Sequence, residues 1–403
     1  MRHVGDIRGR GASREGSGGE LVSAMMGRSD RQEIHILHIV PSFEVGGMEN
    51  GLINLINGMD PCRFRHSLCV LSGEGGAVRR IRAECDVFKL RKLPGNDFSI
   101  PFRIARRFCA QRPNIVRTYS WGAWGEGLTA GWLMGRRVLI HSEHGFSNLG
   151  IHPPTLRRAL GQRLAARFTN TVVAVTEPIR TALIERVGMR PEKVVTIENG
   201  VDTTRFVPRA GDDLRESLGI PKGVCLVGTV ARLDPIKNIG SVIAALPELP
   251  TVHYLIVGEG PELGSLRALV VALCLSSRVH FLGARDDVAQ LMSILDLFIL
   301  PSDNEGCSNT LLEAMSTAVP VIASAVGGTP TLIKHYVTGI LIAPNDARAM
   351  VRHIRSYLDD PSRFRDIGRA ARISVMRNHS LAEMIRRYEQ VCEFAVRKVG
   401  ASH

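Results

Sequence analysis

The chain has 403 residues, of which 44% are apolar, and it carries a formal net charge of +12. This length is too great for one ordinary hydrophobic core, so we expect two domains. No apolar run reaches the roughly 18 residues that a membrane-spanning helix needs. The eight cysteines are scattered without a Cys-x-x-Cys pair, which argues against a disulfide framework or a zinc site and is typical of a reducing cytoplasm with buried thiols.

The positive charge is concentrated in the first half of the chain. Residues 1–200 contain 29 Lys and Arg against 18 Asp and Glu, whereas the remainder contains 22 against 21. Residues 1–31 are rich in Arg, Gly and Ser and lack the apolar core of a signal peptide. We therefore predict that they form a disordered tail.

The first predicted domain, residues 32–200, opens with a strand, a glycine loop and a helix. Residues 34–40 are an apolar run, Gly46 and Gly47 follow in the loop, and residues 48–59 have a helical pattern. This order is the start of an α/β unit. The two glycines could let the backbone approach a diphosphate, because glycine lacks Cβ and tolerates positive φ. The alternative is an ordinary tight turn.

Similar units recur along the chain. In the first domain we predict further strands at 66–71, 114–118, 138–144 and 171–175. In the second, residues 201–380, we predict them at 224–230, 251–257, 278–282, 297–300 and 321–323. The alternation of strands and helices predicts an α/β fold of two doubly wound, Rossmann-like domains that face each other across a cleft. A ligand should then bind between the domains, at the carboxyl ends of the strands.

Two basic helical stretches lie in the first domain. Arg103, Arg106 and Arg107 share one helix face, and residues 157–167 interleave four arginines with leucines. Such runs are usually a solvated face. The alternative is docking on an anionic membrane surface, to which arginines are attracted.

Two positions in the second domain have the chemistry of a phosphate site. Arg232 and Lys237 flank Pro235, so a planar fork and a point charge could converge on a diphosphate; the alternative is an exposed basic loop. Further on, the stretch from Gly258 to Gly264 has the spacing Gly-x-Gly-x-x-x-Gly. It is a poor dinucleotide fingerprint, because the next strand does not end in a ribose-binding acid.

Two glutamates eight positions apart, Glu305 and Glu313, lie across a predicted loop and helix. Ser308, Asn309 and Thr310 between them are good helix N-caps, and the N–H groups and positive dipole end at such a position bind phosphate. The carboxylates could accept hydrogen bonds from sugar hydroxyls. The alternative is one exposed acid and one capping acid.

One pattern extends over four stretches: Pro301-Ser302-x-x-Glu305-Gly306, Leu311-Leu312-Glu313-Ala314-Met315, Pro320 to Ser324, and Gly327-Gly328. Together they resemble the signature of the family 4 glycosyltransferases. These are retaining enzymes of the GT-B fold. His141-Ser142-Glu143-His144-Gly145, at the end of a predicted strand, resembles a stretch found in part of that family. Together with this stretch, His38-Ile39-Val40-Pro41-Ser42 and Gly46-Gly47-Met48-Glu49 near the start of the chain resemble a bacterial exopolysaccharide-associated subgroup of the PEP-CTERM type. Asn50 stands where many relatives have arginine.

The resemblance implies a role for each matching residue. Arg232 and Lys237 would neutralise the leaving diphosphate, Glu305 would contact sugar hydroxyls and Glu313 the ribose. His144 would adjoin the transferred sugar, with a weaker role for His141. The remaining donor-binding positions are expected at Gly46, Gly47, Gly258, Arg285, Gly306, Cys307, Ser308, Leu311 and Leu312. A last helix at about 381–398 would cross back onto the first domain, and no metal or cofactor is required.

These observations predict a retaining hexosyltransferase. It would move a sugar from a nucleotide-diphosphate sugar to a lipid-linked or saccharide hydroxyl in bacterial polysaccharide or glycolipid biosynthesis. We expect it in the cytoplasm. Peripheral attachment to the inner face of the membrane is the alternative that the basic helices of the first domain leave open. One alternative is a nucleotide-sugar epimerase of the same fold. Another is a non-catalytic binding protein for sugar nucleotides or nucleic acid, although no helix-turn-helix, RNP or metal-finger signature supports a nucleic-acid partner.

Overall fold

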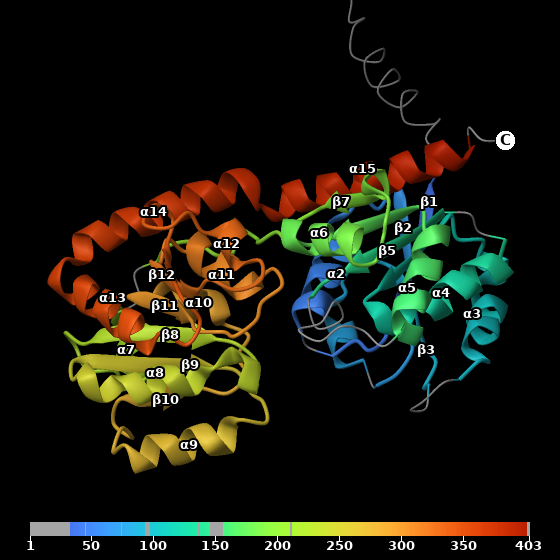
Figure 1. The fold of residues 1–403 in the computed structure, drawn as a ribbon. Coiled ribbons are helices and arrows are strands. Elements are labelled where there is room, and N and C mark those ends of the chain that lie inside the picture. Colours follow the sequence, from blue (N-terminus) through green and yellow to red (C-terminus); the bar gives the residue numbers. More distant parts are fainter. Residues whose placement is uncertain are drawn as a thin grey trace, which may run out of the picture.

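The computed structural model describes residues 33–44, 46–73, 75–92, 97–135, 138–145, 156–209 and 212–400. The predicted tail, residues 1–31, lies outside the described residues. Two α/β domains stand side by side, with the last two helices running along the same side of both (Figure 1). The predicted fold class of two doubly wound domains is confirmed.

The first domain is built on a parallel sheet that has, within the described residues, seven strands in the order β3-β2-β1-β4-β5-β6-β7. Ile36 in the central strand β1 pairs with His66 of β2 on one side and Ile115 of β4 on the other. The strands are β1 Ile34–Val40, β2 Phe64–Val70, β3 Cys85–Lys89, β4 Ile115–Tyr119, β5 Val138–Glu143, β6 Thr171–Ala174 and β7 Val194–Thr196. The edge strands β3 and β7 were not predicted.

Helices cover both faces of this sheet. Helices α3, α4 and α5 lie next to one another on one face, and α2 packs on the opposite face with α15. Their bounds are α2 Gly47–Gly58, α3 Ile100–Phe108, α4 Trp121–Leu133, α5 Leu156–Phe168 and α6 Glu177–Glu185, with short 3-10 turns η1 Gly76–Arg80, η2 Cys109–Gln111 and η3 Pro191–Lys193.

The second domain has a parallel sheet that contains, in the described part of the chain, six strands in the order β10-β9-β8-β11-β12-β13. They are β8 Cys225–Val230, β9 Val252–Val257, β10 Val279–Phe281, β11 Leu297–Leu300, β12 Val321–Ser324 and β13 Ile340–Ile342. The helices are α7 Asp212–Ser217, η4 Pro235–Lys237, α8 Ile239–Ala245, η5 Leu246–Glu248, α9 Leu263–Ala272, α10 Val288–Ser293, α11 Asn309–Ser316, α12 Thr329–Leu332, α13 Ala347–Asp359 and α14 Pro361–Asn378.

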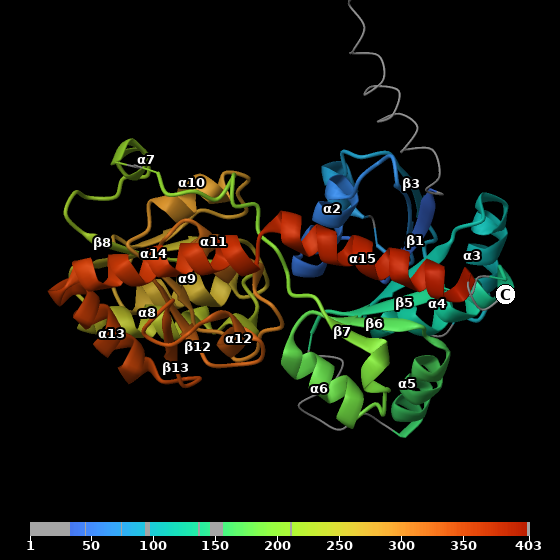
Figure 2. The same cartoon turned by 90° about the horizontal axis from the view of Figure 1, so that it is seen from above.

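The last helix, α15 Leu381–Gly400, lies against the first domain, whereas α14 packs on α11 in the second (Figure 2). The chain passes between the domains twice at neighbouring points, where Val201 forms a β-bridge with Ser380. Tyr388 of α15 is buried, and the guanidinium of the buried Arg117 lies 4.2 Å from its ring centroid. This cation–π contact helps to fix α15 on the sheet.

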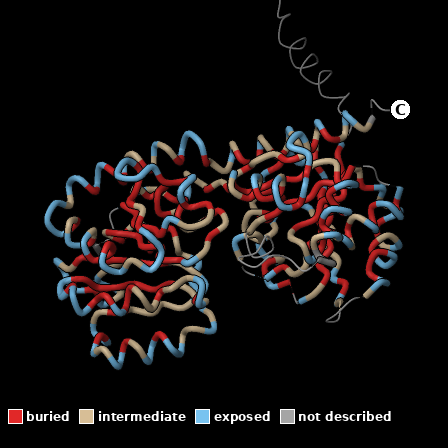
Figure 3. The backbone as a smooth tube through the Cα atoms, viewed as in Figure 1, coloured by how far each residue is buried: buried red, intermediate tan, exposed pale blue. Residues whose placement is uncertain are grey.

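Burial follows the central strands of both sheets (Figure 3). Every residue of β1 is buried, as expected for a parallel strand covered by helices on both faces. No helix in the described ranges is long and apolar enough to cross a membrane. The cysteines fit the expectation of buried thiols only in part, because Cys62, Cys109 and Cys274 are exposed.

Candidate functional site

Loops that follow the carboxyl ends of strands in both domains meet at one place. Asn309, the first residue of α11, donates from its Nδ2 to the carbonyl of Gly47 at 3.1 Å. Asn199 Nδ2 donates to the carbonyl of Cys307 at 3.0 Å. The backbone of Gly306 lies so close to the first domain that a Cβ there would be 2.5 Å from the carbonyl oxygen of His144. The predicted site residues of the two domains are therefore neighbours.

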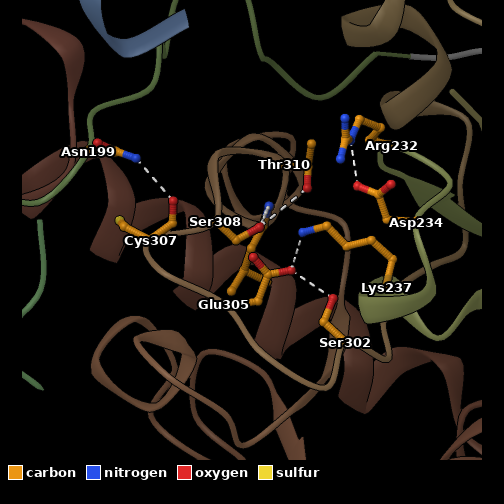
Figure 4. A network of polar contacts seen from close by, with 10 residues as sticks. Asn199, Arg232, Asp234, Lys237, Ser302, Glu305, Cys307, Ser308 and Thr310 are labelled. Atoms are coloured by element: carbon orange, nitrogen blue, oxygen red, sulfur yellow. Dashed lines mark hydrogen bonds and ion pairs between the residues drawn. The ribbon is translucent and has the colours of Figure 1, made fainter. Parts of the chain in front are cut away.

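Lys237 and Glu305 form an ion pair within this site (Figure 4). Lys237 Nζ lies 2.6 Å from Glu305 Oε1, and the same oxygen accepts a hydrogen bond from Ser302 Oγ at 2.7 Å. Only 7% of the Glu305 side chain is exposed, against 22% for Lys237. The pair holds a buried carboxylate beside a cation that can still reach a bound anion.

Arg232 lies in the same region as Lys237 and is open to solvent (Figure 4). Its Nε donates to Asp234 at 2.5 Å, and 69% of its side chain is exposed. Across the interface, burial raises the pKa of Glu49 in α2, and the positive charge of Arg232 acts in the opposite direction. Arg232 is thus a cation held in place by one carboxylate and free to contact a ligand.

The carboxyl of Glu313 on α11 is a weaker acid than an ordinary glutamate. Burial raises the pKa of its carboxyl to about 7, although the positive charges of Arg205 and Arg80 act against the shift. A carboxyl with this pKa exists in both protonation states near neutrality. It can accept or donate a hydrogen bond to a hydroxyl such as those of ribose.

Arg80 was not among the predicted site residues. Its guanidinium donates to Asn50 Oδ1 at 2.6 Å, and its charge acts on Glu313 of the other domain. The family resemblance had left a charge missing at Asn50. Here a cation from η1 reaches that position, which no local motif around Arg80 could have indicated.

The N-terminus of α11 is capped by its own loop. Ser308 is the N-cap, and its Oγ accepts from the amide of Leu311 at 3.3 Å, while its carbonyl accepts from the amide of Leu312 at 3.3 Å. Both leucine side chains are fully buried. These two amides therefore already have partners, and they could bind a phosphate, as predicted, only if Ser308 released them.

Glycines allow two loops to pack closely beside the site. Gly258 has φ 136°, and a Cβ there would lie 1.9 Å from the carbonyl of Ala231, next to Arg232. Gly327 has φ 53°, and its Cβ would lie 1.7 Å from the carbonyl of Glu305. Gly327 and Gly328 of the family signature thus pack directly against the backbone of the Glu305 loop. Gly46 differs from our expectation, since its φ of −160° is ordinary extended backbone.

The two histidines of the His141–His144 stretch occupy different surroundings. His144 lies at the domain interface, where its ring stacks on Tyr119 and its Nε2 has no hydrogen-bond partner among the described residues. Burial lowers its pKa to about 3, so the ring is neutral at physiological pH. His141 is fully buried in the first domain, stacked 3.9 Å from the Trp124 ring. That position does not fit the weaker active-site role expected for it.

Arg285 lies further out, on the surface of the second domain. It forms an ion pair with Asp287 at 2.6 Å, and the neighbouring carbonyl of Gly283 accepts from the amide of Gly258 at 2.8 Å. The loop is therefore adjacent to Gly258, as its predicted role near the base requires. In the part of the chain that the structure describes, no group of three His, Cys, Asp or Glu side chains is placed to hold a metal ion.

Comparison with known proteins identifies the class. Residues 45–205 match the family model Glycosyltransferase Family 4, and residues 211–374 match the model Glycosyl transferases group 1. The solved structure of Anabaena HepE in complex with UDP and glucose superposes with a TM-score of 0.80 at 24% identity, covering 90% of this chain and 100% of that one. WaaG, a glycosyltransferase involved in lipopolysaccharide biosynthesis, superposes with a TM-score of 0.68 at 18% identity, covering 89% of this chain and 99% of that one.

This chain is a glycosyltransferase of the GT-B type. Its first domain corresponds to Glycosyltransferase Family 4 and its second to the group 1 glycosyl transferases.

Curated relatives carry several different activities. N-acetyl-alpha-D-glucosaminyl L-malate synthase of Bacillus anthracis is 29% identical over 64% of this chain and 68% of its own length. D-inositol 3-phosphate glycosyltransferase of Salinispora tropica is 30% identical over 60% and 56%. UDP-Gal:alpha-D-GlcNAc-diphosphoundecaprenol alpha-1,3-galactosyltransferase of Escherichia coli is 28% identical over 62% and 67%. The aligned part thus spans roughly half to two thirds of these relatives.

Proposed function

We propose that this protein is a retaining glycosyltransferase that moves a hexose from a nucleotide-diphosphate sugar to a hydroxyl acceptor in bacterial polysaccharide or glycolipid biosynthesis. One observation carries the proposal: the buried Glu305 carboxylate and two cations, Lys237 and Arg232, converge beside the N-terminus of α11, where the two domains meet. A carboxylate that can accept hydrogen bonds from sugar hydroxyls, next to cations that can bind a diphosphate, suits a sugar nucleotide.

The geometry supports a division of labour. As the anomeric bond breaks, charge develops on the leaving diphosphate, and Arg232 and Lys237 stabilise that charge most strongly in the transition state. Glu305 accepts hydrogen bonds from donor-sugar hydroxyls, and Glu313 from the ribose. His144 is neutral, and its Nε2 has no hydrogen-bond partner in the described part of the chain, so from the acceptor-side domain it is available to a sugar hydroxyl.

The donor and acceptor are proposed by chemistry. The structure of Anabaena HepE contains UDP and glucose, so uridine diphosphate sugars are the first donors to test. The E. coli relative is named for transfer to a diphosphoundecaprenol-linked sugar, so a lipid-linked acceptor is the first acceptor to test. A polyprenyl carrier would bring the enzyme to the inner face of the cytoplasmic membrane.

The experiment incubates purified protein with a donor panel and such an acceptor and determines the configuration of the new linkage by NMR. The expected product keeps the anomeric configuration of the donor, and Lys237→Ala forms little of it. An inverted product would contradict the retaining mechanism. A parallel incubation without acceptor tests the epimerase alternative, which predicts a C2-epimerised nucleotide sugar.

A further inference from the structure

A set of large apolar side chains lies in solvent on the outer side of the first domain. On α5, Leu160, Leu164 and Phe168 have exposed fractions of 56%, 61% and 38%, and on α4 Trp132 and Leu133 have 61% and 47%. The rings of Trp132 and Phe168 are in contact, with centroids 5.0 Å apart. The two helices therefore present one continuous apolar surface, which we call the outer patch and define by these five residues.

The outer patch is not the other side of a core-facing stripe. The outward residues of α5 fall at positions 160, 163, 164, 167 and 168, the spacing of one helix face, whereas Ala165 and Ala166 on the inward face are buried. Contiguous apolar surface of this kind marks an interaction site on a soluble domain.

Exposed arginines lie on the same helix as two leucines of the outer patch and on the nearby helix α3. Arg163 and Arg167 lie beside Leu164 on the same helix face, and both are exposed. The carbonyl of Arg167 accepts from Lys193 Nζ at 3.0 Å, but neither guanidinium has a hydrogen-bond or ion-pair partner among the residues that the structure describes. Arg106 on the adjacent helix α3 is exposed and equally without a partner in the described ranges. The sequences of α3 and α5 contain no acid, and Glu126 of α4 is paired with Lys92.

We propose that the outer patch is a docking surface for an anionic lipid bilayer. Leucine and aromatic side chains would enter the boundary between headgroups and acyl chains, and the interleaved arginines would contact lipid phosphates. A protein partner would have to cover three arginines with carboxylates while burying the leucines. A bilayer surface supplies both chemistries at once.

The placement of the helices suits this role. Helices α3, α4 and α5 cover one face of the first sheet, and α3 and α4 lie at the end remote from the second domain (Figures 1 and 2). The second domain could then move against a docked first domain. The benefit of docking rests on the proposed function, because only a membrane-bound acceptor would gain from it, but the binding itself does not.

The test is co-sedimentation of the full chain with vesicles, without donor or acceptor. We expect binding to phosphatidylethanolamine vesicles that contain phosphatidylglycerol, and little binding to phosphatidylcholine alone. Arg163→Gln/Arg167→Gln should weaken binding by about fivefold per arginine, the ratio that corresponds to about 1 kcal/mol per basic residue near an anionic surface. Leu160→Ser/Leu164→Ser should weaken binding to anionic vesicles at least as much.

A matched control lies on α14 of the second domain, where Ile373 and Met376 are exposed at 59% and 51% beside the exposed Arg377. Ile373→Ser/Met376→Ser and Arg377→Gln should bind vesicles like the wild type. Equal loss in the α14 variants, or no binding of the wild type to anionic vesicles, would overturn the proposal. A concentration-dependent dimer that only the outer-patch variants abolish would assign the surface to a second copy instead.

A thermal-shift measurement with nucleotide-diphosphate sugars separates this result from the proposed function. The outer-patch variants should keep any donor-induced shift that the wild type shows. Vesicle binding without any donor shift would leave the docking surface in place and contradict the transferase. A donor shift without vesicle binding would do the reverse.

Discussion

Lys237 and Glu305 are 68 positions apart in the chain, yet their charged groups lie 2.6 Å from each other. They come from two different loops of one sheet, η4 after β8 and the loop after β11, and β8 and β11 are adjacent strands. The parallel sheet brings both loops to the same edge, which is why one buried ion pair can define the centre of the site.

Breaking this ion pair should destabilise the second domain. Lys237→Met leaves the Glu305 carboxylate buried with Ser302 as its remaining partner, so we expect a loss of about 2–3 kcal/mol in the free energy of unfolding. Lys237→Met/Glu305→Gln should regain much of this loss, because a neutral amide keeps the Ser302 hydrogen bond. Urea unfolding measures both. A double variant no more stable than the single would show that the charge is not the cause.

Gly306→Ala should separate the two domains. The new Cβ would lie 2.5 Å from the carbonyl of His144, so the loop or the domain must move. We expect a larger radius of gyration by small-angle X-ray scattering, with little change in secondary structure. Gly264→Ala is the matched control, since nothing lies within 4 Å of a Cβ at that position. Identical scattering for Gly306→Ala and the wild type would argue against the observed contact.

Glu313 should make the protein less stable as pH rises. Its pKa is raised to about 7 in the folded state from an ordinary 4.5, so the folded chain binds the extra proton between these values and stability falls as that proton is lost. Glu313→Gln lacks this dependence. We expect the variant to gain on the order of 2 kcal/mol over the wild type between pH 4.5 and pH 7.

Unfolding at several pH values, with the exposed Glu192→Gln as control, measures this difference. Parallel stability curves for Glu313→Gln and the wild type would contradict the raised pKa.

The buried histidines should make the protein more stable as pH rises, the opposite of the effect of Glu313. Burial lowers the pKa of His66 to about 4 and of His144 to about 3, both from 6.5. Their unfolded forms bind protons that the folded forms reject, so stability is lost as pH falls below about 6.5. Each histidine should account for a loss of about 2 kcal/mol in the free energy of unfolding as pH falls from 6.5 to 5. His144→Gln should lose its share of this pH dependence, and an unchanged slope would place the ring in water.

Much of the fold could be predicted from the sequence because the central strands are buried on both faces. Such strands appear as unbroken apolar runs, as at β1 and β11. The strands β3, β7 and β13 lie at sheet edges and were missed; β3 is only half-buried, and β7 and β13 have three residues each. Their pattern is too short or too polar to stand out.

The site could be predicted only where its residues form a local motif. Glu305, Ser308 and Glu313 lie close together in the sequence. The contact of Arg80 with Asn50, by contrast, depends on how η1 folds against α2. Sequence could not show that Gly46 is extended or that Gly327 lies under Glu305, because both depend on packing between distant segments. The burial of His141 against Trp124 is of the same kind.

The most direct test of the account is a thermal-shift panel of nucleotide-diphosphate sugars on the wild type, Glu313→Ala and Arg232→Ala. A donor present at about 100 times its Kd should stabilise the wild type by about 2.7 kcal/mol and raise its Tm by a few degrees. We expect such a shift for one donor and its loss in both variants. The absence of a shift with every donor, or an equal shift in all three proteins, would contradict a sugar-nucleotide site at this position.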